Sequence, residues 1–234
     1  LARTYDSINP TVTLSSSAPQ SVNVPISVNV VLSESTNNFV ANDITPVNAT
    51  VSAFAGSGTT YGFMLTPLAK LGKAQGQFSA VVNAGTFTDA AQNSNTASNM
   101  LARTYDSINP TVTLSSSASQ KVNAPISANV VLSESTSNFH ANDITTVNAT
   151  VTGFAGSGAS YSFTLTPLAK LDKAQGLFSA VVGAGTFADA TGNTNTNSNT
   201  LTRTYDSVGP TVTLISDALP IVNDPITVYV ALSE

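Results

Sequence analysis

The chain has 234 residues and a formal net charge of −5, and only 9% of its residues are charged, well below the roughly 25% of an ordinary soluble domain. This balance excludes a basic nucleic-acid-binding surface, and the absence of cysteine excludes disulfides, thiolate metal sites and a cysteine nucleophile. Because 41% of the residues are apolar, we expect a folded chain and not a disordered one. No apolar run reaches the about 18 residues that are needed to span a membrane.

Strand patterns follow one another at short, regular spacing along residues 11–105. Between residues 26 and 32, apolar side chains occupy every second position, which is typical of a strand with one buried face. Pro46 is typical of an edge strand, and Gly56 and Gly58 indicate a turn. These patterns predict an all-β sandwich. Its strands, about seven in number, are expected at residues 11–14, 25–32, 44–47, 49–54, 61–65, 78–82 and 96–105.

An internal repeat with a period of 100 residues dominates the sequence. The segment at residues 1–7 returns unchanged at 101–107 and, with Thr202 in place of alanine, at 201–207. Only 22 of the 100 positions differ between the first two copies. The period exceeds the roughly 20–45 residues of a solenoid unit and matches an immunoglobulin-like (Ig-like) sandwich of about 100 residues. We expect the end of a preceding repeat at 1–5, Ig-like repeats at 6–105 and 106–205, and the first two strands of a further repeat at 206–234.

The segment at residues 206–234 supplies only two of the strands that a sandwich needs. Two strands alone are marginally stable in water. We therefore expect this segment to be ordered only where further chain, or a neighbouring molecule, completes its sandwich. Because the sequence also begins without methionine, we interpret it as a segment of a longer protein.

Short motifs recur in the same order in each complete repeat. In the first repeat they are Pro10-Thr11-Val12-Thr13, Pro25-Ile26-Ser27-Val28, Leu32-Ser33-Glu34, Asn42-Asp43-Ile44-Thr45, Phe54-x-Gly56-x-Gly58, Ala84-Gly85 and Asp89-Ala90-x-x-Asn93. Together they resemble the bacterial Ig-like repeats of very large surface adhesins and other secreted repeat proteins. The resemblance covers essentially the whole chain and implies tandem sandwiches in an extracellular protein of the bacterial surface. The sequence departs from the usual family pattern at Leu32, at Asn48-Ala49 and at Ala91-Gln92.

The four acids of the first repeat all fall at ends of predicted strands. Asp6 precedes the first strand, Glu34 follows the second, Asp43 opens the third, and Asp89 lies between the last two. In an Ig sandwich these positions share the pole at which the chain enters, so we expect the four carboxylates to gather there. The second repeat has the same acids at Asp106, Glu134, Asp143 and Asp189.

Three interpretations of these acids remain open. In the first, Ca²⁺, which takes about six to eight oxygen ligands, binds the carboxylates with help from an amide oxygen of Asn193 or Asn195. The family resemblance implies the same, since related adhesin arrays are often stiffened by calcium between domains. In the second, the acids pair with bases of the preceding repeat, and the residues expected at that contact are Lys70, Lys73, Arg103 and Tyr105. In the third, the charges are separate and solvated, since exposed pairs contribute only about 0–1 kcal/mol.

No catalytic constellation recurs in the two repeats. His140 is the single histidine, and Val40 stands at its position in the first repeat, so no histidine-based triad or zinc site is repeated. We therefore expect a protein that is not an enzyme. The first hypothesis is a rigid spacer or fibre segment of a surface adhesin, in contact with neighbouring repeats and with other copies in a fibre or surface layer.

Two other functions are compatible with the sequence. A module that binds a glycan or a protein would use the loop between the second and third strands and the loop between the last two. An accessory domain of a secreted hydrolase is the other alternative. Faithful copying of a 100-residue unit favours a long array, and hence the spacer.

Overall fold

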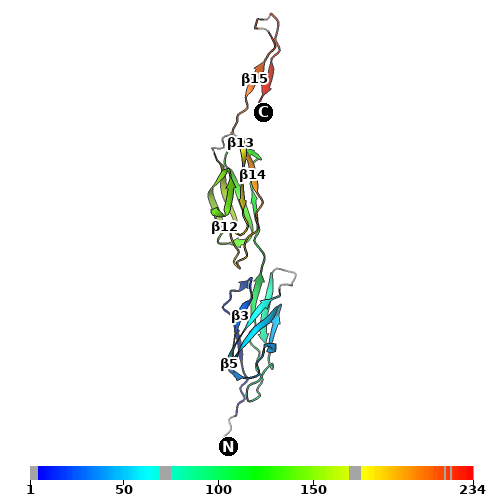
Figure 1. The fold of residues 1–234 in the computed structure, drawn as a ribbon, viewed down its shortest axis with the longest axis vertical. Coiled ribbons are helices and arrows are strands. Elements are labelled where there is room, and N and C mark those ends of the chain that lie inside the picture. The colour runs from blue at the N-terminus through cyan, green and yellow to red at the C-terminus, as the bar shows by residue number, and fades with distance from the viewer. Residues whose placement is uncertain (1–4, 69–74, 169–174, 219, 222, 234) are drawn as a thin grey trace. The chain divides into compact units, whose positions relative to one another are not determined.

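The computed structural model describes residues 5–68, 75–168, 175–218, 220–221 and 223–233. These residues form one β-sandwich in each complete repeat, followed by a two-stranded hairpin (Figure 1). The only helices in the described part of the chain are two 3-10 turns, Ala41–Asp43 and Ala141–Asp143. The fold is therefore all-β with tandem Ig-like sandwiches, as the sequence predicts.

The first sandwich faces a three-stranded sheet with a four-stranded one. The sheet orders are β1-β3-β5 and β2-β7-β6-β4. Neighbouring strands are antiparallel, except that β2 runs parallel to β7. The strands are β1 (Val12–Ser15), β2 (Ser21–Val22), β3 (Ile26–Thr36), β4 (Ile44–Val47), β5 (Ala49–Pro67), β6 (Gln75–Val82) and β7 (Leu101–Asp106).

The second sandwich repeats this topology, with sheet orders β12-β10-β8 and β11-β13-β14-β9. The registers are the same after a shift of 100 residues; Ile44 pairs with Val82, and Ile144 with Val182. Its strands are β8 (Val112–Ser115), β9 (Lys121–Val122), β10 (Ile126–Thr136), β11 (Ile144–Val147), β12 (Ala149–Pro167), β13 (Gln175–Val182) and β14 (Leu201–Asp206).

Alternating apolar side chains build the core between the two sheets. The burial pattern of β3 alternates strictly from Ile26 to Leu32, as the period-two pattern of the sequence predicts. At one end of the first sandwich the core is aromatic. The ring of Phe39 lies 5.5 Å from Phe54, 5.0 Å from Tyr61 and 5.1 Å from Phe87, which fixes the loops that carry Phe39 and Phe87 onto the sheets.

Each sandwich has seven labelled strands, but they differ from the predicted set in three places. The segments at 49–54 and 61–65 belong to one element, β5, because Gly56 and Gly58 turn the chain at positive φ, 132° and 67°, without ending the strand. The short β2 was not predicted, since two residues show no alternation. The last strand begins at Leu101 and not at residue 96. The segment before Leu101 is held by side-chain hydrogen bonds, such as those of Asn99 to Leu14, and not by a regular backbone ladder.

The hairpin after the second sandwich pairs β15 (Val212–Ile215) with β16 (Tyr229–Leu232). Val212 lies opposite Leu232, as Val12 lies opposite Leu32 in the first sandwich. The exposures differ sharply: Val212 and Leu232 are 62% and 63% exposed, whereas Val12 and Leu32 are 5% and 3% exposed. The hairpin thus reproduces the pairing of the first and third strands without their burial.

Candidate metal centre

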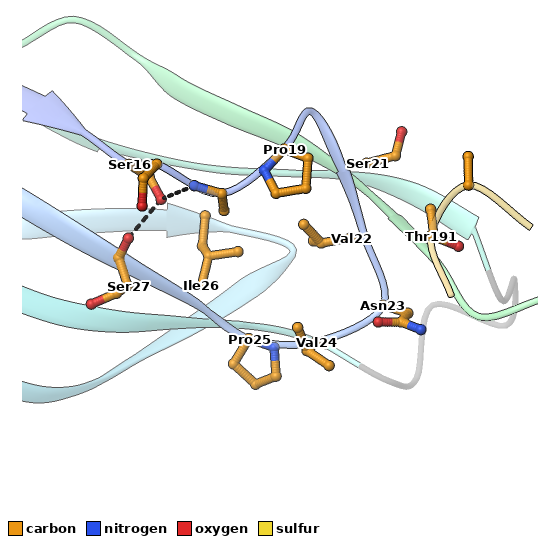
Figure 2. A pocket seen from close by; sticks show the side chains of 13 residues that line it. Ser16, Pro19, Ser21, Val22, Asn23, Val24, Pro25, Ile26, Ser27 and Thr191 are labelled. Carbon is orange, nitrogen blue, oxygen red and sulfur yellow. Dashed lines mark hydrogen bonds between the residues drawn. The ribbon is translucent and has the colours of Figure 1, made fainter. Parts of the chain in front are cut away.

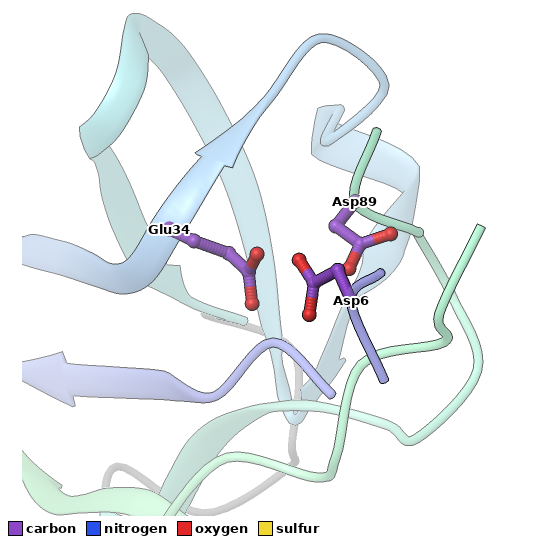
Figure 3. A group of neighbouring side chains, drawn as sticks. All are labelled: Asp6, Glu34 and Asp89. Atoms are coloured by element: carbon purple, nitrogen blue, oxygen red, sulfur yellow. The ribbon is translucent and has the colours of Figure 1, made fainter. Parts of the chain in front are cut away.

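Three carboxylates of the first sandwich converge from distant parts of the sequence. Asp6 lies before β1, Glu34 near the end of β3, and Asp89 in the loop after β6. One oxygen of each lies within 4.8 Å of the other two. Figure 3 shows the three side chains turned toward a common space, with Asp6 between Glu34 and Asp89. The second group has the same composition at Asp106, Glu134 and Asp189.

The alternation of side chains along β3 determines the side of the strand on which Glu34 lies. Along β3, Val28, Val30 and Leu32 point into the core, and Glu34 continues on the same side. At Glu34 the burial is only partial, because the apolar core has ended there. The acid therefore faces the end of the sandwich, where Asp6 and Asp89 lie.

Asparagine positions one aspartate of each group, Asp89 in the first and the half-buried Asp189 in the second. Asp89 is 5% exposed; its Oδ1 accepts the Asn93 N–H at 2.8 Å and its Oδ2 accepts the Asn93 Nδ2–H at 2.8 Å. In the second group, Asn193 makes the same two contacts with Asp189, at 2.9 and 2.8 Å. Asn193 thus acts through its amide N–H groups, which hold the carboxylate in place.

The loop of the first repeat keeps this geometry despite its departure from the family pattern. Gln92 adopts φ 72° where Gly192 adopts φ 90°. Positive φ is strained for a residue with a side chain. The Gln92 N–H still donates to the Asp89 carbonyl at 3.3 Å, as the Gly192 N–H does to Asp189. This backbone hydrogen bond of the loop is therefore kept, whereas the two hydrogen bonds of the Thr191 hydroxyl have no counterpart at Ala91.

Within each group, the glutamate and one aspartate have pKa values that are shifted in opposite directions. Burial raises the pKa of Glu34, and the charges of Asp89 and Asp6 raise it further. Burial also acts to raise the pKa of Asp89, but the hydrogen bonds from Asn93, Ala91 and Gln92 outweigh it and hold the pKa below its usual value. One acid is thus held ionised while another is crowded by like charge, and a cation would relieve that repulsion.

The donor set fits a hard cation. Each group offers three carboxylates, and Ca²⁺ is bound by carboxylate, carbonyl and water oxygens. Asp6, Glu34 and Asp89 would hold the ion in the first repeat, and Asp106, Glu134 and Asp189 in the second, with carbonyls or water supplying the rest.

The fourth predicted acid lies outside each group. Asp43 ends a 3-10 turn, and its Oδ2 accepts the Val40 N–H at 2.7 Å. Asp143 makes the same 2.7 Å contact with the His140 N–H. The structure therefore brings together three of the four acids, because the fourth carboxylate is taken up by its own turn.

Arg103 and Tyr105, predicted at a contact between repeats, have partners within their own sandwich. The Arg103 guanidinium donates to the carbonyls of Ser16, Ala18 and Ala102. Tyr105 packs against the core of the first sandwich. Lys70 and Lys73, named with them, lie outside the described residues.

Two asparagines have structural roles that the sequence did not predict. The counterpart of Asn95 in the second repeat, Asn195, was expected only as a calcium ligand, but it is buried and its Oδ1 accepts the Phe187 N–H at 3.0 Å. Asn95 is 2% exposed, and its side chain bonds to four backbone groups, at Asn83, Thr86, Phe87 and Thr96. Asn99 binds both the N–H and the carbonyl of Leu14. The available signal was the odd-numbered run of asparagines at 93, 95 and 99, which reflects an extended segment that is fixed by its side chains.

Comparison with known proteins identifies the family model of the bacterial Ig-like domain, which matches residues 6–105 and again residues 106–205. Among solved structures, the chain is similar to a tandem of titin domains, with 11% identity, coverage of 89% of this chain and 67% of that chain, and a TM-score of 0.36. It is also similar to the human OSCAR ligand-binding domain, with 13% identity, coverage of 83% and 99%, and a TM-score of 0.29. No curated protein matches the chain. Within the described residues, no helix has the length and hydropathy to cross a membrane.

Proposed function

Because the chain belongs to the bacterial Ig-like domain family, we propose that it is a non-catalytic spacer or stalk segment of a bacterial surface adhesin. The observation that carries this proposal is the direct succession of two like sandwiches. β7 ends at Asp106 and β8 begins at Val112, so only residues 107–111 separate the strands. A connection this short restricts bending far more than a glycine–serine tether.

Small-angle scattering of the 234-residue chain tests the spacer. We expect an extended particle whose scattering fits one narrow range of angles between the sandwiches. The matched control carries a flexible glycine–serine insertion between Ser107 and Ile108, which should broaden the range. If the unmodified chain already required a broad ensemble, the spacer proposal would be wrong.

We further propose that Ca²⁺ binds the two acid groups and stiffens the array. The support is the convergence of three carboxylates. Burial, and then the charges of the two neighbouring carboxylates, raise the pKa of Glu34 and of Glu134, and a cation would relieve that repulsion. Asp106 is the last residue of β7 and also a member of the second group. A bound ion would therefore tie the end of β7 to Glu134 and Asp189.

Thermal unfolding in calcium and in EDTA tests this site. At a free calcium concentration about 100 times the dissociation constant, binding stabilises the folded state by about 2.7 kcal/mol. Glu134→Gln should abolish the calcium-dependent rise of one unfolding transition. Asp143→Asn, which changes an acid outside the group, should leave the rise intact. Equal calcium responses in both variants, or none in the unmodified chain, would remove the metal site and leave a metal-free spacer.

A further inference from the structure

The second strand and the last strand of each sandwich, β2 and β7 in the first, are direct neighbours and run parallel. In the first sandwich Ser21 pairs with Thr104 and Val22 with Tyr105. The Thr104 N–H also donates to the Gln20 carbonyl at 2.9 Å. The second sandwich repeats this arrangement between β9 and β14 and between Thr204 and Gln120. The segment that enters the sandwich is therefore bonded to the segment that leaves it.

An asparagine extends this pairing beyond the short strand β2. The Leu14 N–H donates to Asn99 Oδ1 at 2.8 Å, and Asn99 Nδ2 donates to the Leu14 carbonyl at 2.9 Å. Asn199 makes the same two bonds with Leu114, at the same distances. One side chain thus supplies the donor and the acceptor that a neighbouring strand would supply, and it closes the outer edge of β1 at Leu14.

An arginine joins the same two segments between the asparagine and β2. Arg103 Nε donates to the Ala18 carbonyl at 3.2 Å, and Arg103 Nη2 donates to the Ser16 carbonyl at 3.1 Å. Hydrogen bonds from a charged donor are stronger than neutral ones. Arg203 binds Ala118 and Ser116 in the same way.

The loop that Arg103 holds is itself anchored to β3. Ser16 Oγ donates to the Ser27 carbonyl at 2.6 Å and accepts the Ala18 N–H at 3.3 Å, as Figure 2 shows. Farther along, the Thr96 N–H donates to the Pro10 carbonyl at 2.9 Å. Hydrogen bonds therefore join residues 10–22 to residues 96–105 along their whole length. We call this pair of segments the parallel seam.

Tension on the chain ends would load the parallel seam in shear. The chain enters the first sandwich at Asp6, beside Glu34, and leaves along β7 at Asp106, which pairs with Gln75 at the opposite end of β6. Pulling on Asp6 and Asp106 would therefore slide the two segments past each other in opposite directions. Bonds that lie across such a load share it and must break together, whereas a seam opened from one end loses its bonds one at a time.

We propose that the parallel seam is the force-bearing element of each sandwich, with Asn99 and Arg103 in the first repeat and Asn199 and Arg203 in the second as its key side chains. The proposal rests on the spacer function, since an array that holds a tip away from a surface is the setting in which the chain is stretched. It assigns these residues a mechanical role inside one repeat.

Single-molecule stretching of the 234-residue chain, held at its two ends, tests the proposal. The unmodified chain should give one unfolding event for each sandwich. Asn99→Ala removes two seam bonds and should raise the unfolding rate of the first sandwich under load by about tenfold. The second sandwich, with Asn199 unchanged, is an internal reference in the same molecule.

Asn95→Ala is the matched control, because the Asn95 side chain bonds only within residues 83–96 and does not cross the seam. It should lower the equilibrium stability at least as much as Asn99→Ala and change the unfolding rate under load much less. If both variants raised that rate equally, or if Asn99→Ala left it unchanged, the seam would have no special mechanical role.

The direction of pulling gives a second test. The chain has no cysteine, so engineered cysteines provide unique attachment points. Handles at Ser7→Cys and Ser107→Cys load the seam in shear, whereas handles at Ser7→Cys and Ser94→Cys open it from one end. We expect a clearly lower unfolding force in the second geometry, and equal forces would overturn the proposal. Neither test uses the scattering result, so a failed spacer and a failed seam are distinguishable.

Discussion

Single polar side chains do much of the work that backbone ladders do in ordinary sheets. The described residues contain no buried side-chain nitrogen or oxygen without a hydrogen-bond partner. Asn95 is an example of such a buried side chain, since its Oδ1 accepts hydrogen bonds from the N–H groups of Thr86 and Phe87 at 2.8 and 3.0 Å. Those two N–H groups would lose their partner if the side chain were shortened.

Asn95→Ala is expected to destabilise the first sandwich by about 3 kcal/mol, because each unsatisfied buried donor costs about 1–3 kcal/mol. Urea denaturation measures the loss. Asn37→Ala, at an exposed position that is serine in the second repeat, should change the stability by no more than about 0.5 kcal/mol. A loss of under 1 kcal/mol for Asn95→Ala would mean that water or a rearranged loop satisfies those N–H groups.

The two kinds of acid in each group should respond oppositely to pH. Burial, then the charges of Asp189 and Asp106, raise the pKa of Glu134, so the folded chain holds this proton more tightly than the unfolded chain and the charge opposes folding. In EDTA, Glu134→Gln should therefore raise the unfolding midpoint at neutral pH. The gain should vanish as the pH falls below the ordinary value of 4.5, where both states hold the proton.

The pKa of Asp189 is shifted in the opposite direction, and so is its effect on stability. Burial acts to raise its pKa, but hydrogen bonds from Asn193 and Thr191 outweigh this and lower it below 3.8. The ionised carboxylate therefore stabilises the fold above pH 3.8, and the contribution is lost as the pH falls through the folded value. Asp189→Asn should destabilise the chain at neutral pH, with a difference that shrinks in acid. Denaturation at a series of pH values checks both signs, and the same sign for both variants would contradict this division of charge.

At the scale of the element, β5 depends on a close approach of its own backbone. A Cβ atom on Gly56 would overlap the Thr60 carbonyl oxygen and the Tyr61 Cα, at φ 132°. Gly56→Ala should therefore cost about 3 kcal/mol or more, from strain and overlap together. Gly85→Ala is the matched control: its φ is 76° and nothing lies within 4 Å of the added Cβ, so it should cost about 1–2 kcal/mol. Equal losses in denaturation would mean that β5 relaxes around the new atom.

The elements also show which features a sequence reveals. The alternation in β3 predicted its buried face, because a strand repeats every two residues. The approach of Glu34 to Asp6 and Asp89 was predicted from the pole that these positions share in an Ig sandwich. Asp43 could not be separated from that group in advance, since a 3-10 turn has no such period. The partners of Arg103 are backbone carbonyls, which every residue carries, so the sequence indicated its charge and not its place in the seam.

At the scale of the whole molecule, each repeat has what it needs to fold as a unit. The buried cluster of the first sandwich draws its members from Val12 to Leu101, with Tyr105 packed against it. Residues 1–100 and 101–200 differ at 22 positions, yet among the described residues only one of these differences falls in the buried core. It is Val28 in the first sandwich and Ala128 in the second, both with 0% exposure.

This single core difference provides a test of independence. Val28→Ala should lower the unfolding transition of the first sandwich by about 2 kcal/mol, through lost burial and a cavity. Ala128→Val should raise that of the second by a similar amount, because the other described core residues of the second sandwich match those that surround Val28. Calorimetry of the whole chain should show each substitution moving one transition and leaving the other in place, since sandwiches with separate cores unfold separately. One shared transition that moves with either substitution would mean that the repeats fold cooperatively, and a stretched array would then yield in larger steps than one repeat at a time.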